Sequence, residues 1–180
     1  MENGSLSVRS GRGDGGVSDT GDTNRTPKDH PVFAALGSID ELQASLGVAK
    51  AQCRVSGERP SSIVSILEEF QRQCFTLGGA VAAIHRGSPL GQTALDDAPR
   101  RLEAILTEYE RLVPPMTDFA LSGRDICSAE IDRSRTIARR CERDLVRFLT
   151  DTTETEPILR WINILSDVLF VLARYCEGPL

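Results

Sequence analysis

Hydrophobic residues recur at every third or fourth position along five stretches of the chain, as expected for the buried face of an amphipathic helix. The stretches run over about residues 32–53, 61–85, 96–112, 125–149 and 156–176. The chain contains no convincing run with a period of two, so the pattern predicts no strand. Long helices with short connections favour an up-and-down bundle. We therefore expect an all-α fold, a five-helix bundle over residues 31–180.

Residues 1–30 have a different composition, rich in Gly, Ser, Asp, Asn and Arg and poor in apolar side chains. Such a segment cannot offset its ordering entropy by burial, so we expect it to be flexible. Glycines also let backbone N–H groups approach a phosphate closely. No GK[ST] follows, so this is not a Walker loop, and taken alone it is a weak signal of nucleotide binding.

Composition and charge exclude several classes of function. The 180 residues carry a net charge of −5, so the broad positive field of a nucleic-acid or membrane-surface protein is not expected. The strongest apolar run, residues 168–173, is too short to span a bilayer, and the first residues lack a signal core. These features predict a cytoplasmic protein. The five cysteines are odd in number and show no Cys-x-x-Cys pair, so we expect reduced thiols and no metal site.

Arginine is concentrated in the fourth predicted helix, where residues 133–147 read RSRTIARRCERDLVR. Arg135, Arg139 and Arg143 are spaced by four, which stacks them on one helix face. A ladder of guanidinium groups suits a polyphosphate, because each one can bind two phosphate oxygens. The alternative is a solvated face paired with Glu142 and Asp144, and for an isolated helix that is the more common outcome.

Two further stretches place polar residues among apolar ones. In RWINILSDVLFVLARY, Asn163 and Asp167 share a face with Ser166 beside them, either as a structural network between helices or as a ligand-facing stripe. Spacing alone does not separate these alternatives. In GSIDELQASLG, at 37–47, Ser38 and Glu41 have the pattern of a capping box, which would place Asp40 in a first helical turn.

Six motifs in order resemble the PduO-type cob(I)alamin adenosyltransferases. They are RGDGG at 12–16, RTPKDH at 25–30, GSIDELQASLG at 37–47, FALSGR at 119–124, ARRCERDLV at 138–146 and NILSDVLFVLAR at 163–174. The resemblance implies a homotrimer of five-helix bundles with active sites between subunits. It also implies that the protein uses ATP and Mg²⁺ to transfer a 5′-deoxyadenosyl group to reduced cobalamin, releasing triphosphate.

The resemblance also implies roles for individual residues. Arg139, Arg140 and Arg143 would bind the triphosphate, Glu142 would orient them or the metal, and Asn163 would hold the nucleotide. Arg135 would pair with Asp40 of the adjacent subunit, and Phe119 would press on the lower corrin face. The loop that folds over ATP would be formed by Ser10, Gly11, Arg12, Gly13, Asp14, Gly16, Ser18, Arg25 and Lys28. Arg133 and Arg147 are expected to be solvated.

The chain departs from the family pattern at several positions. Gly15 replaces a lysine, Arg12 a threonine, Asp132 a histidine and Ile164 an arginine, and FALSGR replaces FILPGG. Asp132 is expected to place negative charge near the site. These departures leave a second hypothesis, a homologue that binds ATP or a corrinoid without efficient transfer and acts as a carrier or regulator. An adenosylcobalamin-dependent enzyme would be the recipient of the product, and a longer eukaryotic precursor would be mitochondrial.

Overall fold

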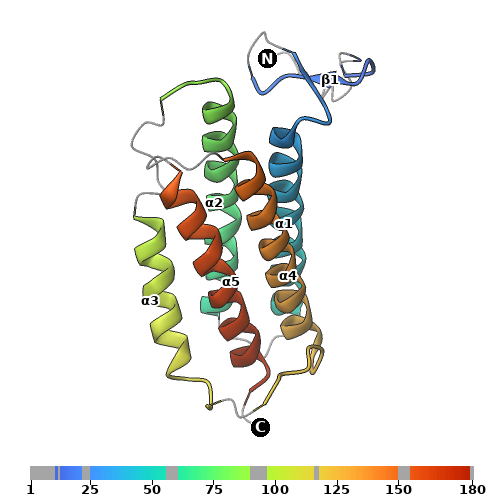
Figure 1. Ribbon diagram of the computed structural model, residues 1–180. Coiled ribbons are helices and arrows are strands. Elements are labelled where there is room, and N and C mark those ends of the chain that lie inside the picture. Colours follow the sequence, from blue (N-terminus) through green and yellow to red (C-terminus); the bar gives the residue numbers. More distant parts are fainter. Residues whose placement is uncertain are drawn as a thin grey trace, which may run out of the picture.

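The computed structural model describes residues 11, 13–21, 25–55, 61–89, 97–115, 118–149 and 155–178. It contains five helices, which confirms the predicted all-α bundle: α1 (Pro31–Val55), α2 (Ser61–His85), α3 (Ala98–Glu110), α4 (Ile126–Phe148) and α5 (Glu156–Cys176) (Figure 1). The bounds of α2 and α5 agree with the predicted ones, whereas α3 is shorter at both ends. None of the helices within these ranges is both long and apolar enough to cross a membrane.

Successive helices run in opposite directions, so the bundle is up-and-down (Figure 1). Packing places α1 between α2 and α4, and α5 between α4 and α3. Trp161 of α5 is fully buried, and its indole N–H donates to Gln73 Oε1 of α2 at 3.0 Å. The predicted apolar stripes form the core, so the hydrophobic pattern fixes which face of each helix is turned inward.

A short antiparallel pairing joins β1 (Val17–Ser18) to β2 (Thr26–Pro27), so the prediction that the chain contains no strand is wrong. Each strand has two residues, too few for a period of two to be visible in the sequence. Gly16, which precedes β1, has a φ of 75°, a conformation that favours glycine. The pair lies beyond the end of the bundle at which α1 begins (Figure 1).

The predicted capping box at Ser38 is also wrong. Because α1 already begins at Pro31, Ser38 lies inside the helix, where its buried hydroxyl donates to the Ala35 carbonyl at 3.0 Å. The ring of His30 accepts instead from the backbone N–H of Val32 at 3.2 Å. A capping box does occur at α4, where the Asp125 side chain accepts from the N–H of Ser128.

Two of the five cysteines form a disulfide, so the prediction of five reduced thiols is wrong for this pair. Cys53, near the end of α1, is bonded to Cys127, near the start of α4, with Cα atoms 5.1 Å apart. The two residues are 74 positions apart in the sequence, and only the packing of α1 on α4 brings them together. Cys74, Cys141 and Cys176 are buried and are not part of a disulfide.

Candidate functional site

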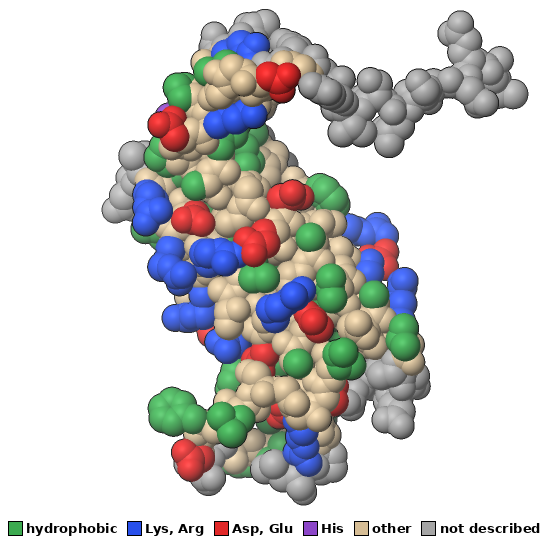
Figure 2. Space-filling model, turned by 90° about the vertical axis from the view of Figure 1, so that its right-hand side faces the viewer, with side chains coloured by type: hydrophobic (Ala, Val, Ile, Leu, Met, Phe, Trp, Pro, Cys, Tyr) green, Lys and Arg blue, Asp and Glu red, His purple; other side chains and the backbone are tan. Residues whose placement is uncertain are grey.

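Two arginines of α4 enter a surface cavity of about 340 Å³ formed by three helices. Arg135 and Arg139 line it from α4, and the other lining residues are Leu106 and Glu110 of α3 and Ser166, Asp167, Phe170 and Val171 of α5. Arg139 is exposed and Arg135 is half-buried. Lys and Arg side chains gather along one flank of the molecule, with acidic side chains among them (Figure 2). The spacing of four therefore does bring two guanidinium groups to one cavity.

The remaining arginines of α4 do not line this cavity. Arg140 forms an ion pair with Glu41 of α1, a helix that contributes no residue to the cavity. Arg143 Nη1 donates to the carbonyl of Arg139 at 2.8 Å, one turn away. Glu142 is half-buried. The structure thus separates Arg140 from Arg139, although the sequence makes them neighbours.

The two arginines that were expected to be solvated form ion pairs within their own helix. Arg133 Nε lies 2.9 Å from Glu130 Oε2, and Arg147 Nη1 lies 3.6 Å from Asp144 Oδ1. Both arginine side chains are more than half exposed, so these pairs contribute little to stability.

A buried ion-pair network lies directly behind the cavity. Asp132 accepts from Arg135 Nε at 3.1 Å and from Arg174 Nη2 at 2.5 Å, and Arg174 also donates to Glu177 Oε1 at 2.7 Å. Sequence reasoning placed Asp132 near the site only as an isolated negative charge. The spacing of three between Asp132 and Arg135 was a usable signal for the first pair. Nothing in the sequence indicates the second, which joins residues 42 positions apart.

The polar residues of α5 divide between the surface and the interior. Asn163 and Asp167 are exposed on one face, and Asp167 lines the arginine cavity. Ser166 is buried and donates to the carbonyl of Asn163 at 3.0 Å, inside its own helix. The exposure of Asn163 and Asp167 argues against a buried polar network between helices at these two positions, and their role toward a ligand stays a prediction.

The glycine-rich segment forms a set of tight turns stabilised by its own backbone. Gly16 N–H donates to the Gly13 carbonyl at 3.3 Å, and Lys28 N–H donates to the Gly16 carbonyl at 2.9 Å. The Lys28 ammonium lies so close to Gly13 that a Cβ there would be 3.1 Å away. Arg25 Nη2 donates to the Val17 carbonyl at 3.1 Å. Gly11, Asp14 and Gly16 are exposed and Ser18 is half-buried, whereas Ser10 and Arg12 lie outside the described residues.

Two contacts hold this segment against the end of α2. Thr26 Oγ1 lies 3.1 Å from His85 Nε2, and Arg86 donates to the carbonyl of Thr20. The rings of His30, His85 and Phe148 pack together beneath it. The cavity that Arg139 lines is formed by residues of α3, α4 and α5 and contains no described residue of this segment.

Asp40 and Arg135 are not brought together within one chain. Asp40 is exposed on α1 and lines a groove of about 260 Å³ between α1 and α2, with Leu36, Ile39, Gln43, Cys74, Phe75 and Gly78. Arg135 lines the cavity between α3, α4 and α5. The predicted pairing joins two different subunits, so it stays a prediction.

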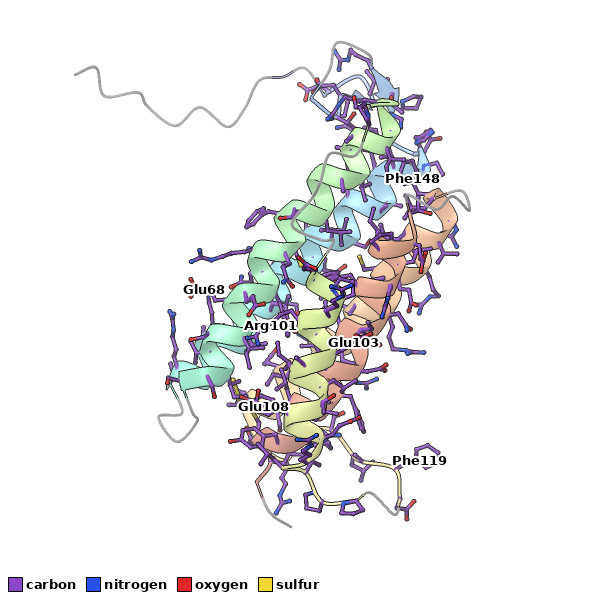
Figure 3. The ribbon with its side chains drawn as sticks, turned by 90° about the vertical axis from the view of Figure 1, so that its left-hand side faces the viewer. Glu68, Arg101, Glu103, Glu108, Phe119 and Phe148 are labelled. Carbon is purple, nitrogen blue, oxygen red and sulfur yellow. A yellow bond between two sulfur atoms is a disulfide. The ribbon has the colours of Figure 1, made fainter. Side chains whose placement is uncertain are left out.

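Phe119 lies in the loop between α3 and α4, with 98% of its surface exposed. Figure 3 shows it projecting from the end of the bundle opposite to Phe148. It lines a cavity of about 380 Å³ with Val113, Pro114, Pro115, Asp118, Ala120, Leu121, Arg124, Arg174, Glu177 and Gly178. Arg174 therefore lines this cavity while pairing with Asp132, and Asp132 pairs with an arginine of the other cavity.

A family model and individual known proteins that are similar to this chain indicate the same family. A family model described as cobalamin adenosyltransferase matches residues 8–176. The chain is 31% identical over 170 residues to the corrinoid adenosyltransferase PduO of Salmonella typhimurium, covering 94% of this chain and 49% of that protein. It thus spans about half the length of that relative. It is 34% identical over 168 residues to the corrinoid adenosyltransferase MMAB of Bos taurus, covering 91% of this chain and 68% of that protein.

Solved structures agree with the sequence matches. A variant of a PduO-type ATP:corrinoid adenosyltransferase from Lactobacillus reuteri, complexed with cobalamin and ATP, superposes with a TM-score of 0.82 at 26% identity. That match covers 95% of this chain and 91% of the other. Another variant from the same organism, complexed with ATP, superposes with a TM-score of 0.79 at 28% identity, covering 94% of each chain.

Proposed function

Because the chain belongs to the cobalamin adenosyltransferase family, we propose that it transfers the 5′-deoxyadenosyl group of ATP to the reduced cobalt of a corrinoid. The products are an adenosylcorrinoid, such as adenosylcobalamin, and triphosphate. The observation that carries the proposal is the cavity of α3, α4 and α5, into which Arg135 and Arg139 bring two permanent positive charges. Glu110 and Asp167 also line that cavity, so it contains both negative and positive side chains, and both of its arginines come from α4.

The reaction needs stabilisation of its leaving group. Cobalt in the +1 state attacks C5′ of the ribose, a Co–C bond forms, and the C5′–O bond breaks with its electron pair passing to the triphosphate. Negative charge on the leaving oxygen grows in the transition state, where preorganised guanidinium groups stabilise it most. We assign this role to Arg139, with Arg143, one turn further along the same helix face, binding further phosphate oxygens and Asn163 holding the nucleotide; Arg140, which pairs with Glu41 of α1, is left out of this assignment.

Magnesium is the proposed metal, accompanying ATP. Mg²⁺ keeps several waters and is commonly held by substrate phosphates plus one or two carboxylates. The described residues contain no group of three His, Cys, Asp or Glu side chains suited to a metal. A Mg²⁺ held mainly by the triphosphate fits that donor set, with the half-buried Glu142 as the candidate protein carboxylate.

The proposed nucleotide site is completed by a second copy of the chain. The glycine-rich segment with Arg25 and Lys28, the Asp40 groove and the Arg139 cavity lie on different parts of one chain's surface. A homotrimer would place the segment and Asp40 of one subunit against Arg135 and Arg139 of the next. Residues Ser10, Gly11, Arg12, Gly13, Asp14, Gly16 and Ser18 would then fold over ATP.

The corrinoid is proposed to bind at the Phe119 cavity. An exposed aromatic ring on a loop is suited to press against the flat lower face of a corrin, where it would displace the axial ligand of cobalt. The recipient of the product would be an adenosylcobalamin-dependent enzyme, and the proposed location is the cytoplasm.

The direct test is an anaerobic assay with ATP, Mg²⁺ and chemically reduced cobalamin. We expect the cob(I)alamin absorbance to fall only when both ATP and the protein are present, with adenosylcobalamin as the product. A protein that binds ATP or cobalamin but leaves the absorbance unchanged would contradict the proposal. That outcome would instead favour a corrinoid carrier or regulator.

A further inference from the structure

Asp132 uses each of its carboxylate oxygens for a different arginine. Oδ1 accepts from Arg135 Nε at 3.1 Å, and Oδ2 accepts from Arg174 Nη2 at 2.5 Å. The residue is only 2% exposed, so its charge is compensated by these two guanidinium groups rather than by water. A buried carboxylate with two fixed cationic partners has little freedom to move.

Arg174 anchors the buried end of this arrangement. It is 7% exposed, its Nη2 is shared between Asp132 and Glu177, and its guanidinium carbon lies 5.3 Å from the centre of the Phe170 ring. Its Nε has no hydrogen-bond partner among the described residues. The orientation of Arg174 therefore depends on the two carboxylates that meet at one of its nitrogens.

Arg135 is the member of this ion-pair network that reaches the cavity at the surface. Its side chain is 27% exposed and lines the same cavity as Arg139 and Asp167. The guanidinium carbon lies 5.9 Å from the centre of the Phe170 ring, so the ring supports both arginines. Because the bond to Asp132 uses Nε, the two terminal nitrogens of Arg135 are left out of it and can serve a ligand in the cavity.

We propose that Asp132 is a positioning residue for the nucleotide: held by Arg174, it fixes the guanidinium of Arg135 so that one terminal nitrogen meets the triphosphate of ATP while the other stays available to Asp40 of the adjacent subunit. The inference rests on the proposed function for the identity of the ligand. Arginine has many rotamers, and a fixed one loses less freedom when phosphate binds. The negative charge at position 132 thus supports anion binding through Arg135 instead of opposing it.

A purely structural role for Asp132 makes a different prediction. Buried ion pairs often contribute little net stability, but removing one partner destabilises the fold because it leaves a charge uncompensated. A structural Asp132 would lower ATP affinity only through damage to the fold. Its effect would then be independent of Arg135.

The test is a double-mutant cycle on ATP affinity, measured calorimetrically on the full chain with Mg²⁺-ATP and no corrinoid. We expect Asp132→Asn and Arg135→Ala each to raise the Kd for ATP at least fivefold. The double variant should bind within about twofold of Arg135→Ala, because the two residues act as one unit. If each single substitution raises the Kd fivefold and the double variant raises it by about the product of the two, the residues act independently and the proposal is overturned. An unchanged Kd in Asp132→Asn would also overturn it.

A second variant separates positioning from folding. Asp132→Asn combined with Arg174→Met and Glu177→Gln leaves no uncompensated charge in the buried part of the network, so the thermal midpoint should recover relative to Asp132→Asn alone while the Kd stays raised. A Kd that returns to the wild-type value along with the midpoint would show that Asp132 is only structural. Asp144→Asn is the matched control, since it removes another i,i+3 Asp–Arg pair of α4, and its Kd should not change.

The binding cycle is independent of the transfer reaction. A wild-type protein that binds ATP but does not adenosylate cobalamin would refute the proposed function. The double-mutant cycle on ATP affinity would still test the role of Asp132, because it does not require the transfer reaction. A wild-type protein that does not bind ATP at all would overturn both.

Discussion

Arg139 and Arg140 are adjacent in the sequence but face different partners. Successive residues of a helix point about 100° apart. Arg139 accordingly lines the cavity with Arg135, whereas Arg140 pairs with Glu41 of α1. This difference in direction makes Arg139 the arginine whose loss should matter most to the transfer step.

We expect Arg139→Ala to lower kcat/KM for ATP by about 100-fold or more, the usual effect of losing one preorganised donor at a developing negative charge. The steady-state rate of adenosylcobalamin formation measures it. Arg133→Ala serves as the control, because Arg133 lies on the same helix and pairs only with Glu130 among the described residues. An Arg139→Ala enzyme that keeps wild-type kcat/KM would refute the assigned role.

Sequence reasoning found Arg135 and Arg139 because their spacing of four is a local property of one helix. It could not find the link from Asp132 to Arg174, since that contact depends on how α4 packs against α5. The sequence motif also suggested one shared role for Arg139 and Arg140, because adjacent positions in a motif do not show that the two side chains point in different directions. Which functional pairs can be predicted thus depends on whether both partners lie on one element.

At the scale of the elements, α1 and α4 are joined by more than apolar packing. The hydroxyl groups of Ser45 and Ser134 lie 2.8 Å apart in the buried interface, and the Cys53–Cys127 disulfide closes the interface at the end of α1. A disulfide that spans 74 residues is expected to stabilise the fold by about 2–4 kcal/mol. The same end of α4 carries the Asp125 cap and follows the Phe119 loop.

Counting thiols tests the disulfide. Burial raises the pKa of Cys141 to about 11 and that of Cys74 further still, so neither is a reactive thiolate at pH 8. We expect the native protein, purified without reductant, to show no fast-reacting thiol. Denaturation without reductant should expose three thiols, and denaturation with reductant five.

Five thiols in the denatured protein without reductant would show that Cys53 and Cys127 are not bonded.

The pairing of Cys53 with Cys127 could not be predicted from the sequence, because it depends on the register between two helices. The helices themselves were predictable, since their stripes repeat over many turns. The two-residue strands and the His30 cap were missed because such short features have no repeat to detect.

At the scale of the whole molecule, the residues assigned to one reaction lie on separate surfaces of the chain. The glycine-rich segment lies at one end of the bundle and Phe119 at the other, with the arginine cavity along the side (Figures 1 and 3). Asp40 lies in the α1–α2 groove beside Phe75, which is 68% exposed. Apolar side chains line most of this groove and Phe75 extends them, so we propose that this apolar surface packs against another copy of the chain.

We expect light scattering to give a mass about three times the 19.6 kDa of one chain. Phe75→Glu should shift the protein toward the monomer and reduce transfer, because it places a charge in the proposed interface. Val55→Glu is the control, since Val55 is 83% exposed at the end of α1 and lies outside that groove. A wild-type protein that runs as a monomer with full activity would refute an intersubunit site.

The fold at this scale could be predicted, because each amphipathic stripe requires a partner and five stripes with short connections leave few arrangements. The assembly could be inferred only from the family resemblance. Asp40 and Phe75 do not reveal in the sequence that they line the same groove.

The central claim is that ATP gives its deoxyadenosyl group to reduced cobalt and leaves as triphosphate. A single-turnover reaction under anaerobic conditions, with the nucleotide products separated by chromatography, tests it most directly. We expect one intact triphosphate for each adenosylcobalamin formed, and neither product when the cobalamin is left unreduced. Recovery of unchanged ATP beside unreacted cob(I)alamin, or of ADP and phosphate without adenosylcobalamin, would contradict it.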